Sequence, residues 1–162
     1  MFEKTPMKNA VANTEACLAN IERYNERANA FITVMADQAL EQAAAIDAAT
    51  ARGESGGVLA GLPVSIKDCI DVAGVPCTNG SLFFMDYVPN EDAPIVAALK
   101  RAGAVIIGKT NLHEFCYGAT TQNPHFGAAL NPWDLDRIPS GSSGGAAAAL
   151  AGDMCIGAVG SD

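Results

Sequence analysis

Residues 140–145, which read Ser-Gly-Ser-Ser-Gly-Gly, contain the residue types that acyl transfer on a serine needs. Glycines permit a tight turn with unusual dihedral angles, and such a turn aims serine hydroxyls and backbone N–H groups at one point. The Ala-rich run 146–151 predicts a helix, whose first N–H groups are free to bind. A flexible linker is the alternative, but the run that follows is too hydrophobic for one. We therefore expect a reactive loop.

A lysine is the second candidate for chemistry. Lys67 ends the apolar run 62–66, and burial at the end of a strand disfavours the charged ammonium form. A neutral lysine accepts a proton from a hydroxyl and so acts as a general base. An ion pair with Asp68 or Asp71 is the structural alternative, and the spacing alone favours it.

The elements that would position these residues begin with helices. Val11, Leu18 and Ile21 recur at helical spacing, and residues 37–51 predict a second, Ala-rich helix. Residues 31–34, between the two, are expected only to pack within this helical segment.

A strand, a helix and a strand follow. Val64 and Ile66 predict a short buried strand, Pro94 opens a helix, and residues 104–108 predict the next strand. This order implies a right-handed crossover and an α/β fold, with a mixed or parallel central sheet and helices on both faces. Residues 109–115 then leave the carboxyl end of the second strand, where such sheets place binding crevices.

Composition indicates a folded, acidic protein. The 162 residues are 49% hydrophobic and have a formal net charge of −8, which predicts a buried core and argues against a surface for nucleic-acid phosphates. The five cysteines are scattered and form neither a CxxC pair nor a metal-ligand spacing. We expect reduced thiols, no metal, no cofactor and a cytoplasmic location. We also expect neither a secretory signal nor a membrane span.

Four short motifs occur in the order typical of the amidase signature family, and the chain closely resembles the N-terminal third of such an enzyme. The motifs are Gly-Leu-Pro-Val-Ser-Ile-Lys-Asp at 61–68, Gly-Lys-Thr-Asn at 108–111, Asn-Pro-Trp-Asp at 131–134 and Ser-Ser-Gly-Gly at 142–145. The resemblance covers residues from about 15 to 162. It implies the N-terminal part of one amidase signature domain, incomplete in this chain, with a helical segment at 1–57 and the start of the α/β core at 58–162.

The resemblance implies a Ser-cisSer-Lys triad that hydrolyses a carboxamide through a serine acyl-enzyme. Lys67 matches the base, and Ser142 matches the cis serine that relays protons between the lysine and the nucleophile. Ser143 is the neighbour and not the match. Residues 160–162 match only the start of the motif that carries the nucleophilic serine, so the resemblance implies that the chain ends before the nucleophile.

The resemblance also implies substrate contacts. Cys116, Tyr117 and Gly118 fall where the family lines its acyl pocket, and core packing is an equally good interpretation of the first two. Ser161 falls beside the nucleophile, where it could contact substrate. Ser140 stands where the family usually has glycine, which leaves the backbone course of this loop open.

Three functions remain open at this point. The first is an amidase for a small-molecule amide, with no membrane or direct nucleic-acid contact, as a monomer or homo-oligomer. The second is the glutamine-hydrolysing component of the tRNA-dependent amidotransferase, its A subunit, which has partner subunits. The third is a truncated product that does not catalyse.

Overall fold

The computed structural model describes residues 9–162, so residues 1–8 of the expected helical segment 1–57 lie outside the described residues. The helices and strands, in chain order, are α1 (Ala10–Ala28), β1 (Phe31–Val34), α2 (Ala36–Ala51), β2 (Pro63–Lys67), η1 (Leu82–Phe84), α3 (Pro94–Arg101), β3 (Val105–Thr110), η2 (Glu114–Cys116), β4 (Gln122–Asn123), β5 (Gly127–Ala128), α4 (Gly144–Ala151) and β6 (Gly157–Val159). Within this described part, no helix combines the length and the apolar character needed to cross a membrane.

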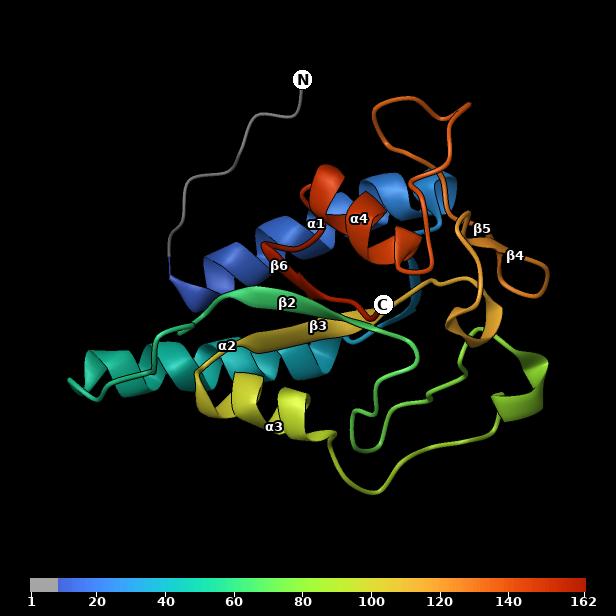
Figure 1. Ribbon diagram of the computed structural model, residues 1–162. Coiled ribbons are helices and arrows are strands. Elements are labelled where there is room, and N and C mark those ends of the chain that lie inside the picture. Colours follow the sequence, from blue (N-terminus) through green and yellow to red (C-terminus); the bar gives the residue numbers. More distant parts are fainter. Residues whose placement is uncertain (1–8) are drawn as a thin grey trace.

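The main sheet has the strand order β1-β3-β2-β6. β2 runs parallel to both β3 and β6, and β1 runs antiparallel to β3. Figure 1 shows α1 and α4 on one face of this sheet and α3 on the other. The predicted α/β class, with a mixed sheet, helices on both faces and a crossover through α3, is confirmed.

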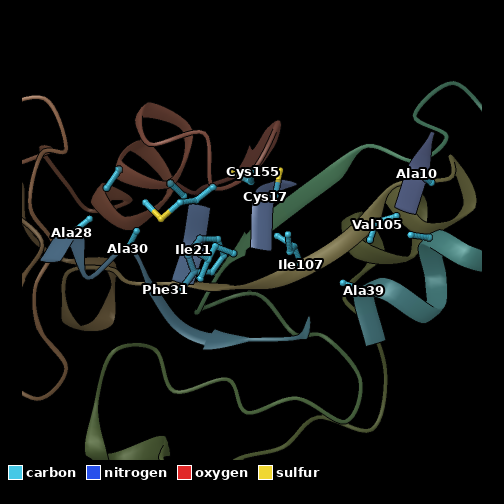
Figure 2. Packing of buried hydrophobic residues seen from close by; sticks show 14 residues of the cluster. Ala10, Cys17, Ile21, Ala28, Ala30, Phe31, Ala39, Val105, Ile107 and Cys155 are labelled. Atoms are coloured by element: carbon cyan, nitrogen blue, oxygen red, sulfur yellow. The ribbon is translucent and has the colours of Figure 1, made fainter. Parts of the chain in front are cut away.

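Alternation along the strands divides the core between the two faces. Val105 and Ile107 of β3 pack with α1, α4 and the segment after α4, as Figure 2 shows for Cys17, Ile21 and Cys155. On the opposite face, a second buried cluster joins β2, β3 and α3 through Val64, Ile66, Ile106 and Val96. β2 therefore turns its apolar side chains to α3 and leaves its other face for polar ones.

Residues 31–34 differ from the expectation, because they form strand β1 and not part of a helical segment. Asn29 ends α1 in the left-handed conformation, with φ of 47°. The Asn25 side chain then accepts from the Phe31 N–H at 2.8 Å and donates to the Phe31 carbonyl at 3.2 Å, which directs the chain onto β3. The run Phe-Ile-Thr-Val consists of residue types common in strands, but its pairing with β3 is non-local and was not predicted.

Candidate active site

Two parallel strands bring the candidate residues to one edge of the sheet. Lys67 is the last residue of β2, and β6 pairs with β2 so that Val159 lies opposite Ile66. Ser161 follows β6 by two residues and therefore lies level with the end of β2, where Figure 1 places the C-terminus. The carboxyl ends of parallel strands are the usual place for a site in α/β sheets.

Lys67 is fully buried, and its side-chain nitrogen contacts two hydroxyls. Lys67 Nζ lies 2.7 Å from Ser142 Oγ and 2.8 Å from Ser161 Oγ, with the Ser161 carbonyl oxygen at 3.4 Å. The structure thus brings together three of the residues identified in the sequence. Hydroxyls exchange protons readily with an amine, so the arrangement is suited to proton transfer.

The ion-pair alternative for Lys67 is wrong, because both carboxylates have other partners. Asp68 pairs with Lys109, whose Nζ lies 2.8 Å from Asp68 Oδ1, and both side chains are buried. The second Asp68 oxygen accepts from the Thr78 backbone N–H at 3.0 Å. Asp71 accepts from the Tyr87 hydroxyl at 3.3 Å. Asp68 is the first residue after β2, and its carboxylate is held by Lys109 and Thr78 and not by Lys67.

The serine loop before α4 is fastened by a buried threonine. Thr121 Oγ1 donates to the Ser140 carbonyl at 2.8 Å and accepts from the Gly144 N–H at 3.0 Å, which spans the loop. The peptide bond between Gly141 and Ser142 inside this loop is cis. Sequence reasoning missed Thr121, because a single threonine in a turn-rich segment has no spacing signal.

The structure shows the backbone conformation of the loop at Ser140, which the sequence left open. Ser140 has φ of 72°, the left-handed conformation that glycine adopts most easily. Farther along, the Gly145 N–H donates to the Asn111 carbonyl at 3.0 Å, and an added Cβ on Gly145 would overlap with that carbonyl. The first turn of α4 therefore lies directly against the segment that follows β3.

The two adjacent serines have different partners. Ser142 contacts Lys67, whereas Ser143 Oγ donates to the Ser161 carbonyl at 3.1 Å and accepts from the Ser161 N–H at 3.2 Å. Ser143 thereby holds the backbone of Ser161 in place. Of the two serines, only Ser142 is placed with its hydroxyl on Lys67 Nζ.

The segment 116–118 lies beside this cluster, but its three residues differ in placement. Burial, and then the neighbouring Cys116 thiol, raise the pKa of Cys69, whose Sγ lies 3.8 Å from Ser161 Oγ. Tyr117 is 89% exposed, so the core-packing interpretation is wrong for it. Gly118 lies against the His113 ring, where an added Cβ would overlap with the ring atoms.

Neither histidine reaches Lys67. His125 Nε2 lies 3.0 Å from Glu114 Oε1, and His113 Nδ1 lies 3.4 Å from Thr120 Oγ1. Across residues 9–162, no three His, Cys, Asp or Glu side chains are grouped as the ligands of a metal ion would be.

Comparison with known proteins gives close relatives. The A subunit of the glutamyl-tRNA(Gln) amidotransferase of Moorella thermoacetica is 49% identical over 149 residues, which cover 92% of this chain and 31% of the relative. The protein of the same name from Trichormus variabilis is 44% identical over 155 residues, 96% of this chain and 32% of the relative. The chain thus spans about a third of the length of these curated relatives.

Solved structures agree with this relationship. A structure described as a vestigial protein complex that reveals the origins of an s-triazine catabolic enzyme is 41% identical, with a TM-score of 0.89 over 91% of this chain and 33% of the other. A bacterial aryl acylamidase of the amidase signature family is 30% identical, with a TM-score of 0.85 over 91% of this chain and 31% of the other. The model of the Amidase family matches residues 12–162. The chain therefore belongs to the Amidase family, whose solved members include amidase signature enzymes.

Proposed function

We propose that this chain provides the proton-transfer part of an active site that hydrolyses a carboxamide, with Lys67 as base and Ser142 as relay. The observation that carries the proposal is the 2.7 Å contact between Lys67 Nζ and Ser142 Oγ, made by a fully buried amine. Membership of the Amidase family supports the same reaction class.

The proposed reaction is acyl transfer. Neutral Lys67 accepts the hydroxyl proton of Ser142, and Ser142 accepts the proton of a nucleophilic serine as that serine attacks the amide carbonyl. In this proposal a serine outside residues 1–162 is the nucleophile. The relay then returns a proton to the leaving amine, the C–N bond breaks, and an acyl-enzyme forms. Water then attacks the acyl carbonyl as the relay accepts its proton. The ester C–O bond breaks, the relay returns that proton to the serine oxygen, and the carboxylic acid is released.

Ser161 and the segment 116–118 contact the substrate in this proposal. Ser161 has an exposed backbone and a hydroxyl next to Lys67, so a substrate at the relay would pass close to it. Cys116 and Gly118 flank Tyr117 in the chain, and the exposed Tyr117 ring would contact the acyl part of the substrate. The proposal needs no metal and no cofactor.

Residues 1–162 form the N-terminal part of one amidase signature domain in this proposal. Five free thiols favour a cytoplasmic location, because reducing compartments keep thiols unpaired.

The test is the release of ammonia from simple carboxamides by the full-length protein that contains these residues. We expect Lys67→Met and Ser142→Ala to reduce release at least a hundredfold, because general-base catalysis contributes about 10²- to 10⁴-fold. Lys100→Met is a matched control, since Lys100 pairs with Asp92 at 2.7 Å in a partly exposed ion pair. Unchanged release in the Lys67 variant excludes the proposed base.

Hydrolysis of glutamine within a tRNA-dependent amidotransferase is the second candidate. The relatives named above favour it, since they carry that name and are more similar in sequence than the aryl acylamidase. Such an enzyme works with partner subunits, whereas the first candidate acts as a monomer or homo-oligomer. An increase in ammonia release from glutamine on addition of the partners supports the second candidate. Release from simple carboxamides without partners supports the first.

A further inference from the structure

Asn111 joins parts of the fold that are distant in the sequence. It follows the last residue of β3 and is fully buried. The Asn111 side-chain nitrogen donates to the Asn29 carbonyl at 3.1 Å and to the Gly127 carbonyl at 3.0 Å. Its side-chain oxygen accepts from the Leu112 N–H at 2.8 Å. Both donors of the amide are used, so these bonds hold the side chain in one orientation.

The backbone beside this amide holds the serine loop directly. The Asn111 carbonyl accepts from the Gly145 N–H at 3.0 Å, and the His113 N–H donates to the Ser142 carbonyl at 3.0 Å. These two bonds fix both the relay serine and the first turn of α4 against residues 111–113. Ser142 therefore takes its position from a backbone segment that the Asn111 side chain orients.

A second route leads from the same amide to the start of the serine loop. Gly127, which Asn111 holds, begins β5, and directly after β5 the Ala129 N–H donates to the Thr121 carbonyl at 3.1 Å. Thr121 Oγ1 in turn donates to the Ser140 carbonyl at 2.8 Å. Both ends of the loop are thus connected to Asn111.

Asn29 supports the β4–β5 hairpin from the end of α1. Its side-chain nitrogen donates to the Phe126 carbonyl at 2.7 Å and to the Ala128 carbonyl at 3.3 Å. Asn29 has the left-handed conformation, which glycine adopts easily. A glycine at this position would keep the backbone and lose the two side-chain hydrogen bonds.

We propose that Asn111 is a positioning residue for the proton relay and acts on Ser142 through residues 111–113 and through Thr121. Ser142 Oγ lies 2.7 Å from Lys67 Nζ, and proton transfer between the two groups requires such a short distance. Loss of the amide lengthens this distance and slows the reaction, although no group that exchanges the proton is removed. The effect on hydrolysis rests on the proposed function, whereas the hold on the loop does not.

The first experiment measures the hold on the loop without any reaction. In the full-length protein that contains these residues, Asn111→Ala should increase hydrogen exchange at the His113 and Gly145 N–H groups at least tenfold. Asn20→Ala is the matched control, because the Asn20 amide also donates to a backbone carbonyl, that of Asp153 at 3.0 Å, beyond the C-terminal end of α4. The control should leave both rates unchanged. Unchanged rates in Asn111→Ala overturn the proposal.

The second experiment is a double-mutant cycle. Asn111→Ala should lower kcat for ammonia release at least tenfold and change KM less than twofold, because the amide acts on the relay and not on substrate binding. In a Ser142→Ala background the same substitution should lower kcat less than twofold, since the hydroxyl that it positions is absent. A merely structural role would lower kcat by the same factor in both backgrounds, and that result overturns the proposal.

Asn29→Gly repeats the cycle with a smaller change and replaces Asn111→Ala if that variant does not fold. We expect it to lower kcat at least threefold, but less than twofold in the Ser142→Ala background. An unchanged kcat in Asn29→Gly overturns the proposal. Full ammonia release by Ser142→Ala alone contradicts the proposed function, whereas equal factors in a protein that needs Ser142 contradict only the role of Asn111.

Discussion

Lys67 Nζ and Ser142 Oγ lie 2.7 Å apart, although 75 positions separate the two residues in the chain. The end of β2 holds one partner, and the loop before α4 holds the other. Each is fixed by contacts of its own, so the pair is preorganised before any substrate binds. Preorganised polar groups stabilise a transition state without first having to be reoriented.

The two adjacent serines of the loop predict decreases in kcat of very different size when each is replaced by alanine. Ser142→Ala removes the hydroxyl that faces Lys67, and we expect kcat for amide hydrolysis to decrease at least a hundredfold. Ser143→Ala removes only the support of the Ser161 backbone, and we expect a decrease of less than tenfold. Steady-state ammonia release measures kcat for the two variants. Equal losses would show that Ser142 has no special role.

The buried Lys109–Asp68 pair predicts a large loss of stability when one partner is removed. Lys109→Met leaves the Asp68 carboxylate buried with no cation, which costs about 3 to 5 kcal/mol of unfolding free energy. The midpoint of urea unfolding measures the loss. Arg52→Met is the control and should leave the midpoint unchanged, because Arg52 and Glu54 form an exposed pair. Equal midpoints for the two variants would contradict the role of the buried pair.

Replacing Thr121 by valine or by serine should affect stability and kcat differently, because only serine keeps the hydroxyl. Thr121→Val keeps the shape but leaves the Gly144 N–H without its acceptor, and we expect a loss of about 1 to 3 kcal/mol in unfolding free energy. The displaced loop should also lower kcat. Thr121→Ser keeps the hydroxyl, so both properties should return close to those of the unmodified protein. Urea unfolding and ammonia release are measured on both variants. If Thr121→Ser loses as much stability and activity as Thr121→Val, the Thr121 hydroxyl does not hold the loop.

The difference in burial among the cysteines predicts the order in which their thiols react. Under native conditions iodoacetamide should modify Cys69 and Cys116 before the buried Cys17, whose pKa burial raises to about 12. Because the raised pKa of Cys69 keeps its thiol protonated, its rate should increase about tenfold from pH 7 to pH 8 and again to pH 9. Timed alkylation followed by peptide mapping measures the rates. A rate at Cys69 that does not change with pH would exclude a protonated thiol.

Local patterns predicted the elements that carry their own signals. The apolar run at Val64 and Ile66 predicted β2, Pro94 predicted the start of α3, and both are confirmed. The short strand at 31–34 was missed, since its partner β3 lies far along the chain. Phe-Ile-Thr-Val consists of residue types common in strands, but whether so short a run forms a strand depends on its tertiary contacts.

The site shows the same division. Lys67 and Ser142 were identified from their motifs, and the structure brings them together. The partners of Asp68 and the role of Thr121 were not predicted. Each of these contacts joins segments that are distant in the sequence, and no spacing along the chain predicts it.

The register between β2 and β6 determines more than the shape of the sheet. Ile66 lies opposite Val159, so the backbone itself sets how far Lys67 stands from Ser161. Side chains alternate along a strand, and a slip of one residue would turn the amine to the α3 face, away from both serines. Weaker packing around Val64 would therefore first displace Lys67 from Ser142 and Ser161, before the protein unfolds.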